Sequence, residues 1–268
     1  IHNFTLDKTL SGKIKALAKQ QGVTLFMLLL SAYQVLLHRY TSQDDIPVSS
    51  TTVGRSQKRF ANVSGYFVNP VIMCADFSDN QAFKDFLINI RKTVVGAIKH
   101  QDYPFIDLVE KLKIKPDSSR SPIAQTSFVL QQPQEFDKIS ELLAGKQINW
   151  SDSDVKIFEL NQQEGHNDLD LEILEAERAF VCELKYNTDL LKADTIQRMA
   201  GHFETLLQGI VSNPDHKISD LPILTEEEKH KILVEWNDTY ADYPKDKCIH
   251  ELFEEQVLKT PDAVAVRK

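Results

Sequence analysis

The first forty residues carry apolar positions at helical spacing. An i, i+4, i+7, i+8 stripe ends at Gly22 and consists of Leu10, Ile14, Leu17 and Ala18. This stripe predicts an amphipathic helix over about 7–21 with a glycine stop. A second apolar run predicts a helix that is capped by Thr24 and extends to about Tyr40. Polar residues interrupt this run before it reaches ~20 apolar residues, so it is typical of a core helix rather than a membrane span.

Strand-like and helix-like segments then alternate along the chain. Residues 1–6 alternate between apolar and polar positions like a strand. Further strands are predicted at about 46–53, 66–75, 125–130, 155–160, 169–174 and 179–186, and helices at about 80–99, 105–112 and 193–211. Acidic residues alternate with Leu and Ile in 168–173, which indicates a strand with one wet face. The pattern predicts an α/β (α+β layered) lobe, a mixed sheet with packed helices.

Three segments fall outside this pattern. The stretch 132–154 is long, polar and irregular, which is typical of a functional or mobile loop. Residues 223–247 begin with a short charged helix and continue as a polar, extended stretch, as a linker does. A new helix-then-strand pattern begins at 248 and is too short to form a core of its own. We therefore predict a main lobe over 1–222, a linker over 223–247 and the start of another domain over 248–268.

Composition narrows the possible partners. The 268 residues are 42% hydrophobic and 26% charged, which is typical of a globular protein. The net charge is −8 and no cluster of Lys and Arg stands out, which argues against nucleic acid. Cys74, Cys182 and Cys248 are odd in number and lack metal-ligand spacing, which favours reduced thiols in a cytoplasmic protein and no metal site. No signal peptide pattern precedes the first strand, and we expect the chain to begin inside a longer one and to bind no membrane.

Three polar motifs carry the functional information. Residues 65–69 read Gly-Tyr-Phe-Val-Asn, 100–105 read His-Gln-Asp-Tyr-Pro-Phe, and 117–122 read Asp-Ser-Ser-Arg-Ser-Pro. Singly, each has a plain structural interpretation: a turn that enters a strand, a histidine at a helix end, and a turn with a local ion pair. Their order and spacing, together with Thr-Val-Gly-Arg at 52–55 and the pattern after 248, are far more specific than any one motif.

This combination closely resembles the later motifs of the condensation domain of nonribosomal peptide synthetases, the unit that makes the amide bond. The resemblance implies that 1–222 is the C-terminal lobe of such a domain, that 223–247 is the linker, and that 248–268 is the incomplete start of the following adenylation domain. The implied fold is one lobe of the two-lobed chloramphenicol acetyltransferase-like fold. The family's His-His-x-x-x-Asp-Gly signature has no match in this chain. The resemblance therefore implies a missing N-terminal lobe and a fragment that is inactive alone.

The resemblance also implies partners and site residues. Donor and acceptor carrier proteins deliver acyl groups on phosphopantetheine arms to a tunnel between the lobes, and no cofactor binds this chain directly. The other implied partners are the missing lobe and the downstream adenylation domain. No residue of this chain is implied to be catalytic. Those implied to line the channel or brace it are Arg55, Gly65, Phe67, Asn69, Asp117, Arg120 and Ser121.

Individual roles also follow from the resemblance. Arg55, slightly favoured, and Arg120 are the two candidates to pair with the aspartate of the absent signature. Gly65 is implied to permit close backbone approach, and Asn69 to bind a pantetheine arm through its amide. Asp117, Arg120 and Ser121 are implied to brace the acceptor side. The loop 132–154 is implied to include the segment that bridges the lobes.

Some alternatives stay open. Residues 166–170 fit His-x-x-x-Asp, but the alternating pattern makes them a strand, and we assign them no catalytic role. The chain could instead be a non-catalytic lobe that docks a carrier protein or the adenylation domain. It could also belong to an epimerisation or heterocyclisation relative. The adenylation-like tail argues against epimerisation, and only the missing half distinguishes heterocyclisation.

Overall fold

The computed structural model describes residues 1–55, 58–60, 62–115, 117, 120–131, 147–150, 153–156, 167–176, 179–242, 244–264 and 266. Two compact units are present, Ile1–Thr225 and Glu226–Lys268. The division at Thr225 falls close to residue 222, where the sequence pattern places the end of the main lobe.

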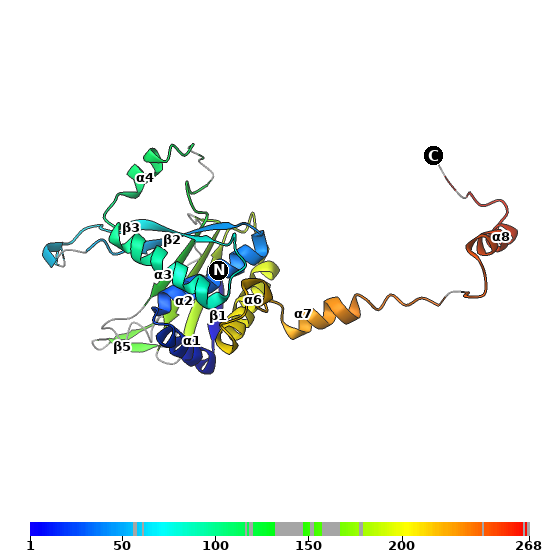
Figure 1. Cartoon of the computed structure of the whole chain (residues 1–268), viewed down its shortest axis with the longest axis horizontal. Helices are drawn as coiled ribbons and strands as arrows, with labels where there is room; N and C mark the ends of the chain where they lie inside the picture. Colours follow the sequence, from blue (N-terminus) through cyan, green and yellow to red (C-terminus); the bar gives the residue numbers. More distant parts are fainter. Residues whose placement is uncertain are drawn as a thin grey trace. The chain divides into compact units, whose positions relative to one another are not determined.

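The first unit is built on a mixed sheet (Figure 1). In the described part its strand order is β1-β8-β7-β4-β2-β3. The strands are β1 (His2–Leu6), β2 (Asp45–Thr52), β3 (Asn69–Asp76), β4 (Thr126–Gln131), β7 (Leu169–Glu175) and β8 (Phe180–Tyr186). Strand β4 runs parallel to both β2 and β7, and the other pairs are antiparallel. A separate antiparallel pair consists of β5 (Ile148–Trp150) and β6 (Ser153–Val155). The predicted mixed sheet is confirmed.

Helices cover one face of this sheet (Figure 1). They are α1 (Lys8–Gln20), α2 (Leu25–Thr41), α3 (Phe83–Lys99) and α6 (Ala193–Ser212), and the shorter elements of this unit are α4 (Phe105–Lys111), η1 (Lys58–Phe60) and η2 (Ile218–Asp220). The predicted cap at Thr24 is confirmed, because its hydroxyl accepts a hydrogen bond from Met27 N–H at 3.2 Å. Asp7 caps α1 in the same way, through Leu10 N–H at 2.7 Å.

The core lies between the sheet and the helix layer. Helix α2 is buried from Met27 to Leu37, as predicted for a core helix. Among the described residues no single helix is long and apolar enough to cross a membrane, and α1 and α2, which pass that test only as a pair, are bent by 108°. The three cysteines are all free thiols. Burial raises the pKa of the Cys182 thiol to about 12, which keeps it protonated and unreactive.

Two predicted strands differ from the observed ones. Strand β3 begins at Asn69 rather than at residue 66, because residues 66–68 belong to a loop held by other contacts. The predicted strand at 155–160 overlaps β6 only at Val155, and residues 157–160 lie outside the described residues. His166 lies outside them as well. Of the other residues in 166–170, which the sequence pattern assigns to a strand, Leu169 and Asp170 lie in β7, whereas Asn167 and Asp168 precede it.

The buried side chain of Tyr33 is expected to make the fold less stable at high pH. The side chain is fully buried and its hydroxyl lies 2.6 Å from Thr126 Oγ1. Burial raises the pKa of Tyr33 far above the ordinary value of about 10, so the folded state keeps the phenol neutral. Above pH ~10 only the unfolded state ionises, and the free energy of unfolding should fall by up to ~1.4 kcal/mol per pH unit. Urea unfolding at pH 9, 10 and 11 should show a shallower decline for Tyr33→Phe, and an unchanged slope would contradict this account.

The second unit contains α7 (Glu226–His230), η3 (Lys231–Glu235) and α8 (Ile249–Lys259). Helix α8 begins with a capping contact in which Cys248 N–H donates to Glu251 Oε2 at 2.7 Å. One side of α8 exposes apolar residues, including Ile249, Phe253 and Val257. Within this unit no residue is buried in the described helices. The described part of this unit therefore forms no core of its own.

Candidate functional site

Arg55 organises the loop between β2 and β3. Its guanidinium donates hydrogen bonds to the carbonyl oxygens of Phe60 at 2.5 Å, Val63 at 2.6 Å and Gly65 at 3.3 Å. The same group lies 4.4 Å from the centre of the Phe67 ring, which also packs on Phe60. Such contacts use the donors and the flat face of the guanidinium together. Three residues of the predicted site, Arg55, Gly65 and Phe67, are therefore brought together in one cluster.

The tightest backbone approach in this cluster lies at Gly54 rather than at Gly65. Gly54 has a φ of +65°, and a Cβ added there would lie 1.8 Å from the Phe67 carbonyl oxygen. A Cβ on Gly65 would instead meet the movable edge of the Phe67 ring at 3.2 Å. The sequence analysis uses Gly54 only as part of the Thr-Val-Gly-Arg pattern and does not predict its close contact with the Phe67 backbone. The available signal was a glycine at the end of a β-branched strand.

Asn69 joins the first two motifs. Its Nδ2 donates to the carbonyl oxygens of Gln101 and Tyr103, both at 2.8 Å. Its Oδ1 accepts from Phe105 N–H at 3.2 Å. Both amide hydrogens and the amide oxygen are thus engaged within the protein. Both donors of Asn69 are thus used within the protein, and a hydrogen bond from this residue to a pantetheine arm stays a prediction.

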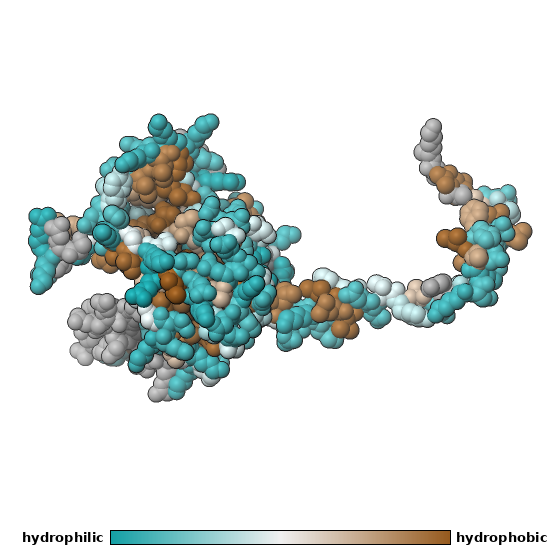
Figure 2. Space-filling view, in the orientation of Figure 1, coloured by the Kyte–Doolittle hydropathy of each residue, from teal (hydrophilic) through white to brown (hydrophobic). Residues whose placement is uncertain are grey.

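Helix α4 and the residues on either side of it present apolar side chains to solvent. Tyr103, Ile106 and Leu112 are exposed by 45%, 71% and 55%. Figure 2 shows a brown, apolar area at the position that α4 occupies in Figure 1. The helix has no buried residue. A surface of this kind is typical of a contact with another protein surface or a ligand.

The third motif lies apart from the other two. Arg120 N–H donates to the Asp117 carbonyl oxygen at 3.3 Å, which closes the predicted turn. The Ser121 carbonyl oxygen accepts from Gln125 Nε2 at 3.0 Å, just before β4 begins. Residues 116, 118 and 119 lie outside the described residues. Among the described residues, the Arg120 guanidinium has no hydrogen-bond or ion-pair partner.

The sheet register explains this separation. Ser49 in β2 lies opposite Ser127 near the start of β4, and Asn69 lies opposite Thr52 at the far end of β2. The third motif precedes β4, so it lies toward the opposite end of the strands from Arg55 and Asn69. The seven predicted residues therefore form two groups rather than one compact site.

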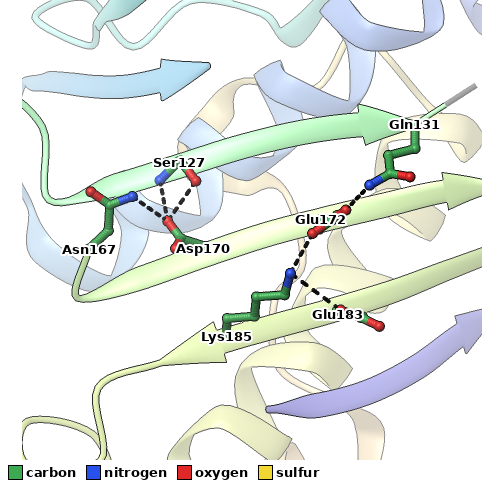
Figure 3. A network of polar contacts seen from close by, with 7 residues as sticks. All are labelled: Ser127, Gln131, Asn167, Asp170, Glu172, Glu183 and Lys185. Atoms are coloured by element: carbon green, nitrogen blue, oxygen red, sulfur yellow. Dashed lines mark hydrogen bonds and ion pairs between the residues drawn. The ribbon is translucent and has the colours of Figure 1, made fainter. Parts of the chain in front are cut away.

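The sheet face away from the helices carries a polar network (Figure 3). One oxygen of Asp170 accepts from Ser127 N–H at 3.0 Å, from its hydroxyl at 2.6 Å and from Asn167 Nδ2 at 2.8 Å. On the same face Lys185 pairs with Glu172 at 2.6 Å. Burial acts to lower the pKa of Lys185, but the bond and charge of Glu172 outweigh it and the pKa is raised. The sequence predicts that this face of β7 is polar. Which side chains pair on it depends on the register of the neighbouring strands.

A pocket of about 460 Å³ lies away from all three motifs, at the end of α2, lined by His38, Arg39, Ser42, Phe77, Asp79, Asn80, Ile218 and Ser219. His38 stacks on Phe77 with ring centres 4.3 Å apart, and its Nδ1 bonds the Gln43 carbonyl oxygen at 2.7 Å. Arg39 donates to three backbone carbonyls of residues 218–221. These contacts hold the end of the lobe in place and do not assemble a general base beside a nucleophile. No group of metal-ligating side chains is present in the described part of the chain.

Solved structures identify the fold. A holo four-domain nonribosomal peptide synthetase bound to AMP and glycine matches with a TM-score of 0.86 at 28% identity, over 98% of this chain and 20% of that chain. The first condensation domain of the CDA synthetase matches with a TM-score of 0.65 at 12% identity, over 84% of this chain and 48% of that chain, and shows the fold alone. The helix-covered mixed sheet is therefore of the chloramphenicol acetyltransferase-like class, as predicted.

The family follows from the sequence comparisons. The family model described as Condensation domain matches residues 1–233, and the chain belongs to the condensation-domain family. Gramicidin S synthase 2 of Brevibacillus brevis is 41% identical over 263 residues, which are 98% of this chain and 6% of that protein. Tyrocidine synthase 3 of Brevibacillus parabrevis is 35% identical over 263 residues, which are 98% of this chain and 4% of that protein. The predicted family is confirmed, and the chain spans a small part of these relatives.

Proposed function

We propose that this chain supplies one lobe of a condensation domain that forms an amide bond between a carrier-bound acyl donor and a carrier-bound aminoacyl acceptor. The observation that carries the proposal is the extent of the match. The chain corresponds to 48% of a solved condensation domain, and its sequence contains no His-His-x-x-x-Asp-Gly. The other lobe, which in the family carries that signature, supplies the proton-handling histidine.

In the proposed reaction, the amine of the acceptor attacks the carbonyl carbon of the donor thioester. A C–N bond forms and the C–S bond breaks. The second histidine of the other lobe takes one proton from the attacking amine and returns it to the departing sulfur, so that the donor's arm leaves as a thiol. This chain holds the reacting groups in a shared channel, which makes the attack effectively unimolecular. The channel wall and its braces comprise Arg55, Gly65, Phe67, Asn69, Asp117, Arg120 and Ser121.

The two arginines have different roles in this proposal. Arg55 would have to release three backbone carbonyls before it could pair with a carboxylate of the other lobe. Arg120 has a guanidinium without a partner among the described residues. We therefore assign the interlobe ion pair to Arg120 and the shaping of the 58–67 loop to Arg55.

The proposed partners follow from the same reaction. Two carrier proteins present phosphopantetheine-linked substrates, and no cofactor is held by this chain itself. Residues 223–247 form the linker and 248–268 the start of an adenylation domain. The exposed apolar side of α8 supports this assignment, because Ile249, Phe253 and Val257 are 86%, 61% and 45% exposed and need a partner surface. The same side would serve a purely docking, non-catalytic lobe, which is the second candidate.

Amide formation with separately supplied lobes distinguishes these candidates. The chain alone, mixed with donor- and acceptor-loaded carrier proteins, should give no product above background. Addition of an N-terminal condensation lobe that contains the signature should restore product. The matched control is the same lobe with the second histidine of its signature changed to alanine, which should remove at least ~10² of the restored rate. Turnover by the chain alone, or no turnover with the active lobe, contradicts the proposed function.

A further inference from the structure

Asn69 satisfies three backbone groups within the five residues 101–105. The N–H of Phe105 is the first of α4 and has no partner inside the helix. Pro104, which precedes it, provides no side-chain cap. The Oδ1 of Asn69 takes this N–H from a distant part of the chain, and its Nδ2 fixes the two carbonyls just before the helix. Asn69, the first residue of β3, therefore caps α4 from a distant part of the chain and ties this helix to β3.

Little else in the described structure holds α4 in place. The helix has seven residues, none of them buried, and a helix of this length is not stable by itself in water. Its packing is mainly against β3. At its other end Lys113 has a φ of +53°, a left-handed conformation that marks a sharp turn. The position of α4 and of the exposed Tyr103 thus depends strongly on the three bonds of Asn69.

We propose that Asn69 is a positioning residue, a latch that fixes the flap 100–112. The flap comprises the second motif, α4 and Leu112. Its apolar side chains, Tyr103, Ile106 and Leu112, face outward and form one wall of the channel only while the latch holds. The latch itself follows from the hydrogen bonds, and its effect on the channel rests on the proposed function. In this inference Asn69 acts through the flap and touches no substrate.

Hydrogen exchange of the whole chain tests the latch directly. In Asn69→Ala, amides of 100–112 should exchange about tenfold faster or more, because three hydrogen bonds are lost at once. Amides of α2 and β4 should keep their protection. Asn89→Ala is the matched control. The Asn89 amide lies on the exposed side of α3, where its partners among the described residues are two side chains, Gln81 at 3.1 Å and Lys92 at 3.4 Å. This control should leave 100–112 unchanged.

Asn69→Asp distinguishes a role of Asn69 through its hydrogen bonds from a role through the volume of its side chain. The carboxylate has the same shape, but it cannot donate to the carbonyls of Gln101 and Tyr103 and repels both oxygens. Only the bond from Phe105 N–H can remain, so exchange in 100–112 should be faster than in the parent chain. Protection equal to the parent chain in either variant overturns the proposal. Uniform loss of protection across α2 and β4 also overturns it, because Asn69 would then stabilise the whole unit rather than the flap.

A kinetic measurement with the other lobe added tests the effect on the channel. Asn69→Ala should raise the KM for at least one carrier-bound substrate by about tenfold while kcat changes less, because the wall is misplaced but the histidine is intact. If exchange increases and both constants stay unchanged, the flap is not part of the channel. If no lobe restores turnover even with the parent chain, the proposed function fails while the exchange result still decides the latch.

Discussion

Phe128→Ala is expected to destabilise the first unit by about 3–5 kcal/mol, the range for removal of a fully buried aromatic ring. Phe128 is 0% exposed and lies on β4, between β2 and β7 at the centre of the sheet. Its ring packs against Phe26 and Tyr33 of α2, with centres 5.3 Å and 6.2 Å away. Alanine would leave a cavity where the sheet meets α2, which is buried from Met27 to Leu37. Urea unfolding followed by far-ultraviolet circular dichroism measures the loss.

The next residue along β4 provides the control. Val129 points to the opposite face of the sheet and is half-buried. Val129→Ala should cost on the order of 1 kcal/mol, because fewer buried methyl groups are removed and no aromatic contact is lost. Equal losses for the two variants would mean that the helix-covered face is not the main core of this unit.

Gly54→Ala is expected to break the loop that Arg55 holds. The left-handed backbone at Gly54 costs an alanine about 1–2 kcal/mol. The new Cβ would also lie 1.8 Å from the Phe67 carbonyl oxygen, so the loop must move away. We expect residues 58–67 to lose most of their hydrogen-exchange protection, together with a fall of about 2 kcal/mol or more in the free energy of unfolding. In a reassembled condensation domain, amide formation should fall with it.

Gly12 is the matched control for this substitution. It lies inside α1 in a helical conformation, and a Cβ there would meet nothing within 4 Å. Gly12→Ala should stabilise the chain by about 0.5–1 kcal/mol, because alanine lowers the backbone entropy lost in a helix. The two glycine variants should therefore change stability in opposite directions. A stabilising effect of Gly54→Ala would show that the loop between β2 and β3 is not packed as described.

Local signals predicted most of the fold. The predicted helix over 7–21 matches α1 because the stripe, the Asp7 cap and the Gly22 stop all act within one short segment. Strands β7 and β8 were predicted to within one residue at each end, since their alternation is strict. The start of β3 was placed three residues too early, at 66. The neighbouring sequence does not reveal that Phe67 packs on Arg55, so the apolar run at 66–68 is interpreted as part of the strand.

The candidate site was predicted less completely, because its contacts join distant segments. The motifs themselves were visible, but the bond from Asn69 to Tyr103 spans 34 residues and leaves no local pattern. An amide followed by Pro70 reads equally as a strand end, a ligand contact or a cap. The two-group arrangement depends on the register of β2 against β4, which no residue type encodes by itself.

The pairing of β1 with β8 has a consequence during synthesis. Leu6 pairs with Phe180, and at about 5–20 residues per second the ribosome needs on the order of 10–35 s to make the chain between them. Throughout that time β1 lacks β8, its neighbour in the described sheet, and the apolar surface of α2 has only part of its cover. A nascent chain that stalls before residue 180 therefore exposes the apolar surface of α2 and the unpaired backbone of β1. Both favour chaperone binding or aggregation over folding.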